Sequence, residues 1–365
     1  MALRRLAASA AMAAAALAAA TGVADAKTVV VHPGQSIQRA VDRADRGDTV
    51  RLAPGKYHQN VTIRKRISLV GAGWGPHGSR LFPAANPVPS VCSSPGSVHG
   101  ICVAGRFDQS GNAVAPVRGV TIRNLSVHNF SGFGIGMFLA NQTTVRGVAA
   151  VGNGEYGISG FVLHGVRFLH SLARGNGAPG FYIGDSPRAN AVVAGNRAFR
   201  NGASGVEGIG ILIRDSSWGR VWGNVTRNNC AGVVIVDSGE NPAPATHWAA
   251  WGNVASHNNL ACAAEQGGGA PALSGIGITL FGASHSSLWR NWTNGNRPSG
   301  PSVFSGGIVV ASAAPAGGAD PVGDLIRRNH AHRNSPFDIL YDGSGSGNRF
   351  VRNDCGTSNP SWICS

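Results

Sequence analysis

A recurring asparagine–glycine frame is the feature that most constrains how this 365-residue chain can fold. Asparagines recur in pairs five residues apart, and each pair is followed by Gly and a short alternating apolar segment such as Gly210-Ile-Leu-Ile. The series comprises Asn124/Asn129, Asn153, Asn176, Asn196/Asn201, Asn224/Asn229, Asn253/Asn258, Asn291/Asn296, Asn329/Asn334 and Asn348/Asn353. Successive units are 23 to 38 residues long. Self-similarity at such a period predicts a repeat architecture.

Short strands joined at Asn/Gly corners predict an all-β solenoid, a parallel β-helix with one strand per face in each coil. Equivalent strands then stack roughly 4.8 Å apart, and side chains alternate between core and surface, so Ile211 and Ile213 point inward and Leu212 outward. Corner asparagines can bond the next coil and form a ladder. Three alternative folds are disfavoured. A leucine-rich repeat would need a Leu framework that this chain lacks, and propeller blades would need longer units of four strands. A β-sandwich would not repeat one Asn/Gly frame along the chain.

Both ends and several inserts are also predicted. Ser36–Arg46 places Ile37, Ala40, Val41 and Ala44 on one face of a helix that Ser36 caps and Gly47 ends, and this helix would cover the open first coil. Longer loops are expected at residues 71–119, 239–246, 263–274, 298–305 and 313–322. Such inserts are where function tends to lie in repeat proteins.

The first 26 residues predict a secretory signal peptide. Arg4 and Arg5 precede an apolar, Ala-rich run, and Ala24-Asp25-Ala26 offers a cleavage site. The alternative is a membrane anchor, although Ala is only weakly hydrophobic. We expect a secreted, extracytoplasmic protein with one domain over residues 27–365, a monomer with no membrane span after cleavage.

Cysteine and arginine usage agree with export. Six cysteines in an exported chain predict disulfides. Local spacing favours Cys92–Cys102 and Cys355–Cys364, and the repeat brings Cys230 and Cys262 onto neighbouring coils. The net charge is +14 with only three lysines, so basicity rests on arginine. Arginine suits acidic glycans or cell-envelope polymers, and we expect these rather than nucleic acid as partners. The alternative is that scattered arginines only solubilise the surface.

Two stretches resemble the right-handed parallel β-helix proteins of the pectate-lyase-like superfamily. One is the opening VVVHPGQSIQRAVDRADRGDTVRLAPGKYHQNVTIRKRISLVGAG, and the other is the G-N-x-A-x-x-N-G-x-x-G-I frame at Gly195–Val206. The resemblance implies a right-handed solenoid with a short N-terminal capping helix. It implies little about chemistry, because the motifs of polygalacturonases, pectin methylesterases and mannuronan epimerases are absent. All three lysines lie in the first coils, which disfavours a Lys-base lyase but leaves an Arg-base lyase with calcium open.

Three aspartates occupy matching positions after consecutive strands. Asp185, Asp215 and Asp237 follow Gly180-FYIG, Gly210-ILIR and Gly232-VVIV, so stacking would place neighbouring carboxylates roughly 5 Å apart. They could divide acid and base roles on a glycosidic bond, or bind Ca²⁺ that neutralises a uronate. The alternative is structural, since aspartate after a strand commonly caps a turn.

Other polar and aromatic residues complete the candidate set. Arg214, His164, Tyr182 and Arg188 are predicted to bind substrate beside the aspartates, with Glu207 and Glu240 in nearby corners. His330 and His332 could form a weak metal pair, but surface histidines are the simpler interpretation. The hypotheses are therefore a polysaccharide lyase or glycoside hydrolase acting on acidic polysaccharide, or a non-catalytic glycan-binding scaffold or accessory protein.

Overall fold

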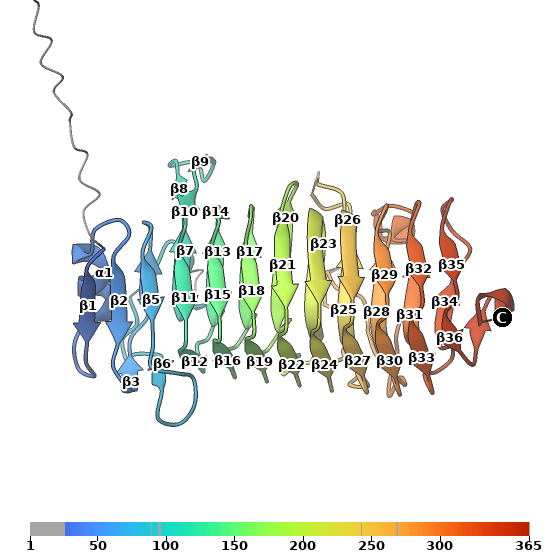
Figure 1. The fold of residues 1–365 in the computed structure, drawn as a ribbon, viewed down its shortest axis with the longest axis horizontal. Coiled ribbons are helices and arrows are strands. Elements are labelled where there is room, and N and C mark those ends of the chain that lie inside the picture. The colour runs from blue at the N-terminus through green and yellow to red at the C-terminus, as the bar shows by residue number, and fades with distance from the viewer. Residues whose placement is uncertain (1–25, 89, 94–95, 242, 268, 365) are drawn as a thin grey trace, which may run out of the picture.

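The chain winds as a parallel β-helix whose coils stack along one long axis (Figure 1). The computed structural model describes residues 26–88, 90–93, 96–241, 243–267 and 269–364. The predicted signal peptide lies outside the described residues apart from Ala26. No helix within the described ranges is long and apolar enough to cross a membrane.

Three parallel sheets form the faces of the solenoid. Sheet A comprises β1 (Thr28–Val31), β2 (Thr49–Leu52), β5 (Ser68–Val70), β11 (Thr121–Arg123), β15 (Thr144–Arg146), β18 (Arg167–Leu169), β21 (Ala191–Ala194), the second half of β23 (Ile209–Trp222), β26 (Thr246–Trp251), β29 (Ser287–Trp289), β32 (Leu325–Arg327) and β35 (Arg349–Val351). Sheet B comprises β3 (Gly55–His58), β6 (Ser79–Phe82), β12 (Ser126–His128), β16 (Ala149–Val151), β19 (Leu172–Arg174), β22 (Arg197–Phe199), β24 (Val225–Arg227), β27 (Val254–Ser256), β30 (Trp292–Asn294), β33 (His330–His332) and β36 (Asp354–Cys355). Sheet C comprises β4 (Val61–Ile63), β7 (Ile101–Ala104), β13 (Ile135–Phe138), β17 (Ile158–Phe161), β20 (Phe181–Ser186), the first half of β23, β25 (Ala231–Val236), β28 (Ile276–Phe281), β31 (Gly306–Ala311), β34 (Ile339–Tyr341) and β37 (Ser358–Asn359).

The predicted alternation of side chains is confirmed. Ile211 and Ile213 belong to the continuous apolar core, and they pair in register with Val233 and Ile235 on the next coil. Leu212 points outward but is only 2% exposed. It joins a second apolar cluster on the outside of sheet C, with Tyr182 and Val234. The outer face of this sheet is therefore covered in part by other segments of the chain.

Asparagine ladders line two corners inside the solenoid. Asn196 donates its backbone N–H and its side-chain amide to Asn224 Oδ1 at 2.9 and 3.0 Å, and Asn224 bonds Asn253 in the same way. This confirms the predicted ladder with two corrections. Asn348 lies at another corner, where its Oδ1 accepts from Asp324 N at 3.0 Å. Asn124 and Asn129 lie one position earlier, exposed and at φ 57°, where most later coils have Gly or another left-handed residue.

The N-terminal cap is a shorter helix than predicted. Helix α1 (Ile37–Arg43) begins at Ser36, whose hydroxyl accepts from Arg39 N, but it ends before Ala44 because Ala44 is extended. The backbone N–H of Asp45 instead donates to the Asp48 carboxylate, which turns the chain into β2.

The predicted excursion over residues 71–119 is wrong as a single loop. Strands β6 and β7 within it belong to the solenoid. The parts outside the solenoid are the irregular stretch between β6 and β7, which contains Cys92, and the antiparallel hairpin of β8 (Arg106–Phe107) and β9 (Ala113–Ala115). The short strands β10 (Val117–Arg118) and β14 (Ala140–Asn141) pair beside it. Two 3-10 turns, η1 (Ala314–Ala316) and η2 (Ser361–Cys364), complete the elements.

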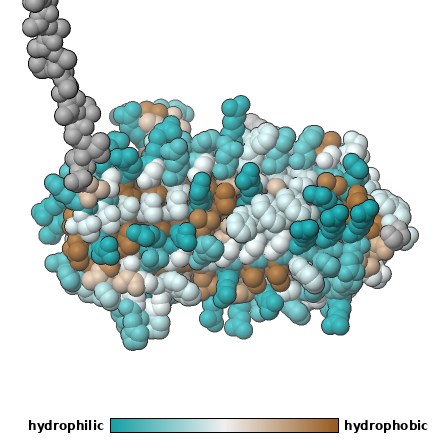
Figure 2. Space-filling model, viewed as in Figure 1, coloured by the Kyte–Doolittle hydropathy of each residue, from teal (hydrophilic) through white to brown (hydrophobic). Residues whose placement is uncertain are grey.

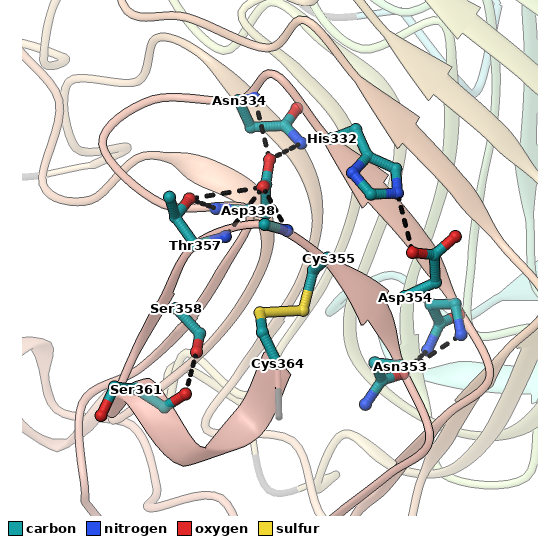
Figure 3. Close-up of a disulfide and its surroundings, with 12 residues drawn as sticks. His332, Asn334, Asp338, Asn353, Asp354, Cys355, Thr357, Ser358, Ser361 and Cys364 are labelled. Atoms are coloured by element: carbon teal, nitrogen blue, oxygen red, sulfur yellow. Dashed lines mark hydrogen bonds and ion pairs between the residues drawn. A yellow bond between two sulfur atoms is a disulfide. The ribbon is translucent and has the colours of Figure 1, made fainter.

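All three predicted disulfides are present. Cys92–Cys102 and Cys230–Cys262 have Cα atoms 5.9 Å apart, and Cys355–Cys364 has them 5.2 Å apart. The last of these closes the C-terminal coil next to Asp338, which accepts hydrogen bonds from Asn334 and Thr357 (Figure 3). Bonds of this kind persist in oxidising compartments.

Candidate functional site on sheet C

A groove of about 650 Å³ crosses the outer face of sheet C from β23 to β34. This volume is typical of ligand sites. Its floor is largely apolar, because the outward residues of β23, β25, β28 and β34 that line it are Leu212, Val234, Thr279 and Leu340. The hydroxyl of Thr279 is buried and has no hydrogen-bond partner among the described residues.

Three of the predicted inserts form the walls of the groove. Pro271 and Leu273 from one insert and Phe304 from the next stand on the side where the strands of sheet C begin. The Cys230–Cys262 disulfide and an antiparallel bridge between Cys262 and Leu273 fix the first insert to the solenoid. Pro315 of η1 lies on the opposite side. The inserts thus convert a flat sheet into a cleft.

Charged residues gather at the β23 end of the groove. Arg214 projects outward from β23 in register with Gly184 and Val236, as predicted. Its guanidinium lies 3.5 Å from the Glu240 carboxylate. Glu207 lines the same end from the corner before β23, where its backbone adopts φ 45°. One arginine is therefore flanked by two glutamates.

Two tyrosines pack against this charged end. Tyr156 and Tyr182 stack with ring centroids 4.8 Å apart, and the Arg214 guanidinium lies 6.0 Å from the Tyr182 ring. The Tyr156 hydroxyl lies 3.5 Å from Glu207 Oε2. The Tyr182 hydroxyl and Arg214 Nε are buried without a hydrogen-bond partner among the described residues. Unpaired buried polar atoms are rare in folded proteins and suggest a role with a ligand.

Burial shifts the pKa values of this cluster. It raises the pKa of the Glu207 carboxyl above its usual range, and the positive charge of Arg214 opposes the rise only in part. Burial likewise raises the pKa of Asp185 and of both tyrosines. Burial disfavours the charged form of Arg214, but Tyr182 and Glu240 hold its pKa above the ordinary value. A carboxyl with a raised pKa beside a permanent cation suits acid–base chemistry.

The three predicted aspartates lie in register at the corner between sheets C and A, where their side chains bond the turn. Asp215 is fully buried and accepts from Ser238 N at 2.7 Å and Ser238 Oγ at 2.6 Å. Asn241 donates to Asp185 at 2.7 Å. Asp237 accepts from Ala245 N at 3.3 Å, and burial raises its pKa. These contacts are those of turn-capping aspartates.

A calcium site does not fit these residues. No group of three or more His, Cys, Asp or Glu side chains in the described ranges is arranged to hold a metal ion. The oxygens of Asp215 already accept hydrogen bonds from Ser238. His330 and His332 instead share the Asp354 carboxylate, at 2.8 and 3.1 Å.

The predicted substrate-binding residues separate into two places. Tyr182 and Arg214 lie together at the charged end of the groove. His164 and Arg188 lie at the corner between sheets C and A, where His164 Nδ1 contacts the Arg188 carbonyl at 2.8 Å. Neither of these two lines the groove.

Comparison with known proteins agrees with this architecture. The family model of the right-handed β-helix region matches residues 96–244. The chain therefore has the right-handed parallel β-helix fold. No curated protein is significantly similar in sequence.

Several solved structures share this β-helix fold. The A-module of the Azotobacter vinelandii mannuronan C-5 epimerase AlgE6 superposes with a TM-score of 0.58 at 15% identity, over 87% of this chain and 88% of that one. The A-module of AlgE4 from the same organism gives 0.54 at 16%, over 90% and 94%. A GH87 α-1,3-glucanase catalytic domain in complex with tetrasaccharides gives 0.54 at 15%, over 91% and 65%. At these identities the likeness concerns the fold.

Sequence reasoning placed Glu207 and Glu240 near the site but gave them no role, and it missed Tyr156. The burial of Glu207 depends on Tyr156 and on the insert after Cys262, which lie far away in sequence.

Proposed function

We propose that the protein binds an acidic polysaccharide in the sheet C groove and cleaves it by hydrolysis, with Glu207 as general acid. The observation that carries this proposal is the half-buried Glu207 carboxyl of raised pKa, beside Arg214 at the end of a groove. Arg214 would hold a sugar carboxylate, for which a planar guanidinium is well suited. The groove would hold neighbouring sugar units.

Hydrolysis needs a second carboxylate, and Glu240 is the best placed. As the glycosidic C–O bond breaks, Glu207 gives its proton to the departing oxygen. Water forms the new bond to the anomeric carbon, and Glu240 takes the proton from that water. Arg214 would orient the chain between the two glutamates. Asp185, Asp215 and Asp237 then support the corner on which Glu240 stands.

Composition and the structural neighbours support this substrate class. The chain has 31 Lys and Arg against 17 Asp and Glu, which favours an anionic partner. The neighbours named above are an epimerase of mannuronan and an α-1,3-glucanase bound to saccharides. The three disulfides and the predicted signal peptide support a location outside the cytoplasm, where such polymers occur.

An activity screen tests the proposal. The mature protein would be incubated with pectate, alginate, hyaluronan and heparin, with and without calcium, while reducing ends and ultraviolet absorbance are followed. New reducing ends without absorbance indicate hydrolysis, and unsaturated products indicate a lyase. Glu207→Gln should abolish product formation without lowering the melting temperature. If folded wild-type protein is inactive on every polymer, the proposal of a catalytic function is wrong.

The apolar floor favours a second candidate function, a non-catalytic glycan-binding scaffold. Leu212, Val234 and Leu340 offer few hydrogen bonds to a sugar chain. In that case Arg214 would bind and no residue would transfer a proton. Binding of a polymer without product formation, weakened by Arg214→Gln but not by Glu207→Gln, would support the scaffold.

A further inference from the structure

A second concave surface lies on sheet B, away from the groove. It has a volume of about 680 Å³ and spans β19 and β22 with the corners beside them. Figure 2 shows hydrophilic residues projecting along the lower edge of the molecule, where the strands of sheet B run in Figure 1. The residues that define this sheet B pocket are Arg174, Arg197, Arg200, Phe199, His170 and Trp74.

The three arginines of the sheet B pocket have no counter-charge. Arg174 ends β19, Arg197 begins β22 on the next coil, and Arg200 follows β22 at the corner. All three are exposed, and none forms an ion pair within the described part of the chain. No acidic residue lines the pocket. Three neighbouring guanidinium groups in one pocket, with no acidic residue lining it, favour an anionic ligand, because guanidinium binds carboxylate and similar anions through paired hydrogen bonds.

Aromatic groups accompany these charges. Phe199 is half-buried in the same pocket, and Trp74 is 48% exposed at its rim. A saccharide ring presents apolar C–H faces that pack on aromatic rings, and its acid group can accept two hydrogen bonds from a guanidinium. The combination suits an acidic sugar better than a bare inorganic anion. Strands on neighbouring coils are roughly 4.8 Å apart, so the ligand would run along the solenoid axis.

We propose that the sheet B pocket is a second, non-catalytic binding site for an acidic polysaccharide, in which Arg174, Arg197 and Arg200 bind its acid groups. The choice of ligand class rests on the proposed function, but the pocket is separate from the groove. It would hold a long polymer on the enzyme while another stretch occupies sheet C.

A charge-matched pair of variants tests this site. The first carries Arg174→Gln, Arg197→Gln and Arg200→Gln, and the second carries the same change at Arg51, Arg123 and Arg146, which are exposed on sheet A. Both lose three positive charges. Binding of pectate and of heparin would be measured by calorimetry at two salt concentrations, in a Glu207→Gln background so that turnover does not interfere. The pocket variant should bind the better ligand at least about tenfold more weakly, and the sheet A variant should stay within about threefold of the parent.

Each other result overturns the proposal. Equal weakening in both variants would mean diffuse attraction to net charge, and no weakening in either would mean that the pocket is not used. Equally tight binding of a single-stranded DNA oligonucleotide would assign the pocket to polyanions in general. These outcomes are distinct from failure of the groove, because Glu207→Gln tests turnover and leaves the sheet B arginines unchanged.

Discussion

Two regions of this solenoid treat buried polar atoms in opposite ways. In the corner ladder, Asn224 donates its backbone N–H to Asn253 at 3.1 Å and its side-chain amide to Asn253 and to the Val193 carbonyl, both at 2.9 Å. At the end of the sheet C groove, the only side-chain partner of Glu207 within the described residues is a tyrosine hydroxyl at 3.5 Å, and the Tyr182 hydroxyl has none.

This difference separates structural from functional polar groups. A fully paired buried amide stabilises the fold, whereas an unpaired buried group costs free energy and remains available to a ligand. The corner aspartates belong with the ladder by this criterion, because Ser238 and Asn241 already occupy their oxygens.

Breaking the ladder should have the largest effect on stability. Asn224→Ala removes the acceptor of two Asn196 hydrogen bonds and the donor to Val193, so the free energy of unfolding should fall by about 3–5 kcal/mol. Urea unfolding measures this loss. Activity per folded molecule should not change. The control is Asn124→Gly, at an exposed left-handed position, which should stay within about 0.5 kcal/mol of wild type; equal losses in the two variants would refute the ladder.

Asp324 is a buried carboxyl with one unpaired oxygen, and its contribution to stability should depend on pH. It lies at the corner before β32, in a separate hydrogen-bonded series with Ser286 and Asn348. Ser286 N donates to one of its oxygens at 2.7 Å, and the other oxygen has no partner in the described ranges. Burial raises its pKa from 3.8 to about 7. The folded protein therefore holds this proton more tightly than the unfolded chain, and the contribution of Asp324 to stability declines as pH rises from about 4 to about 7.

The variant Asp324→Asn should remove that decline. One pKa unit corresponds to about 1.4 kcal/mol, so the variant should gain on wild type by at most about 4 kcal/mol across this range. Urea unfolding of both proteins at pH 4 to 8 measures the difference. A difference that stays constant with pH would mean that Asp324 is ionised in the folded protein throughout.

Arg214→Gln tests whether Arg214 binds substrate in the groove, and its expected effect is smaller than those of the variants above. The variant should raise KM for the acidic substrate about tenfold, because one charged hydrogen-bonded contact is lost. It should also move the alkaline limb of the pH profile upward, because Arg214 lowers the pKa of Glu207. Arg188→Gln makes the same change in charge at an exposed residue outside the groove and should alter neither value. An unchanged KM in the Arg214 variant would remove it from the binding site.

Local pattern was sufficient for much of the fold. The repeat period predicted the solenoid, and the spacing predicted all three disulfides, because both follow from residues in adjacent coils. Leu212 shows where this reasoning ends. Alternation correctly pointed it outward, but its burial comes from inserts whose path no local pattern specifies.

The candidate site was harder to predict for the same reason. Asp215 was conspicuous because it repeats in register, yet repetition is what a structural corner also produces. Glu207 does not repeat, and its environment is assembled from Tyr156, Arg214 and a distant insert. In a solenoid, residues that depart from the repeat are therefore better functional candidates than those that follow it.

The central claim is that Glu207, whose only side-chain hydrogen bond within the described residues is a long one to Tyr156, carries the chemistry, and that the fully bonded Asp215 does not. The most direct measurement compares kcat of Glu207→Gln and Asp215→Asn on the best polymer from the screen, with melting temperatures as a check of folding. Glu207→Gln should lower kcat at least about 100-fold, as loss of a general acid does, and Asp215→Asn should keep it within about threefold. Loss of turnover in Asp215→Asn with full activity in Glu207→Gln would contradict the account and return the site to the corner aspartates.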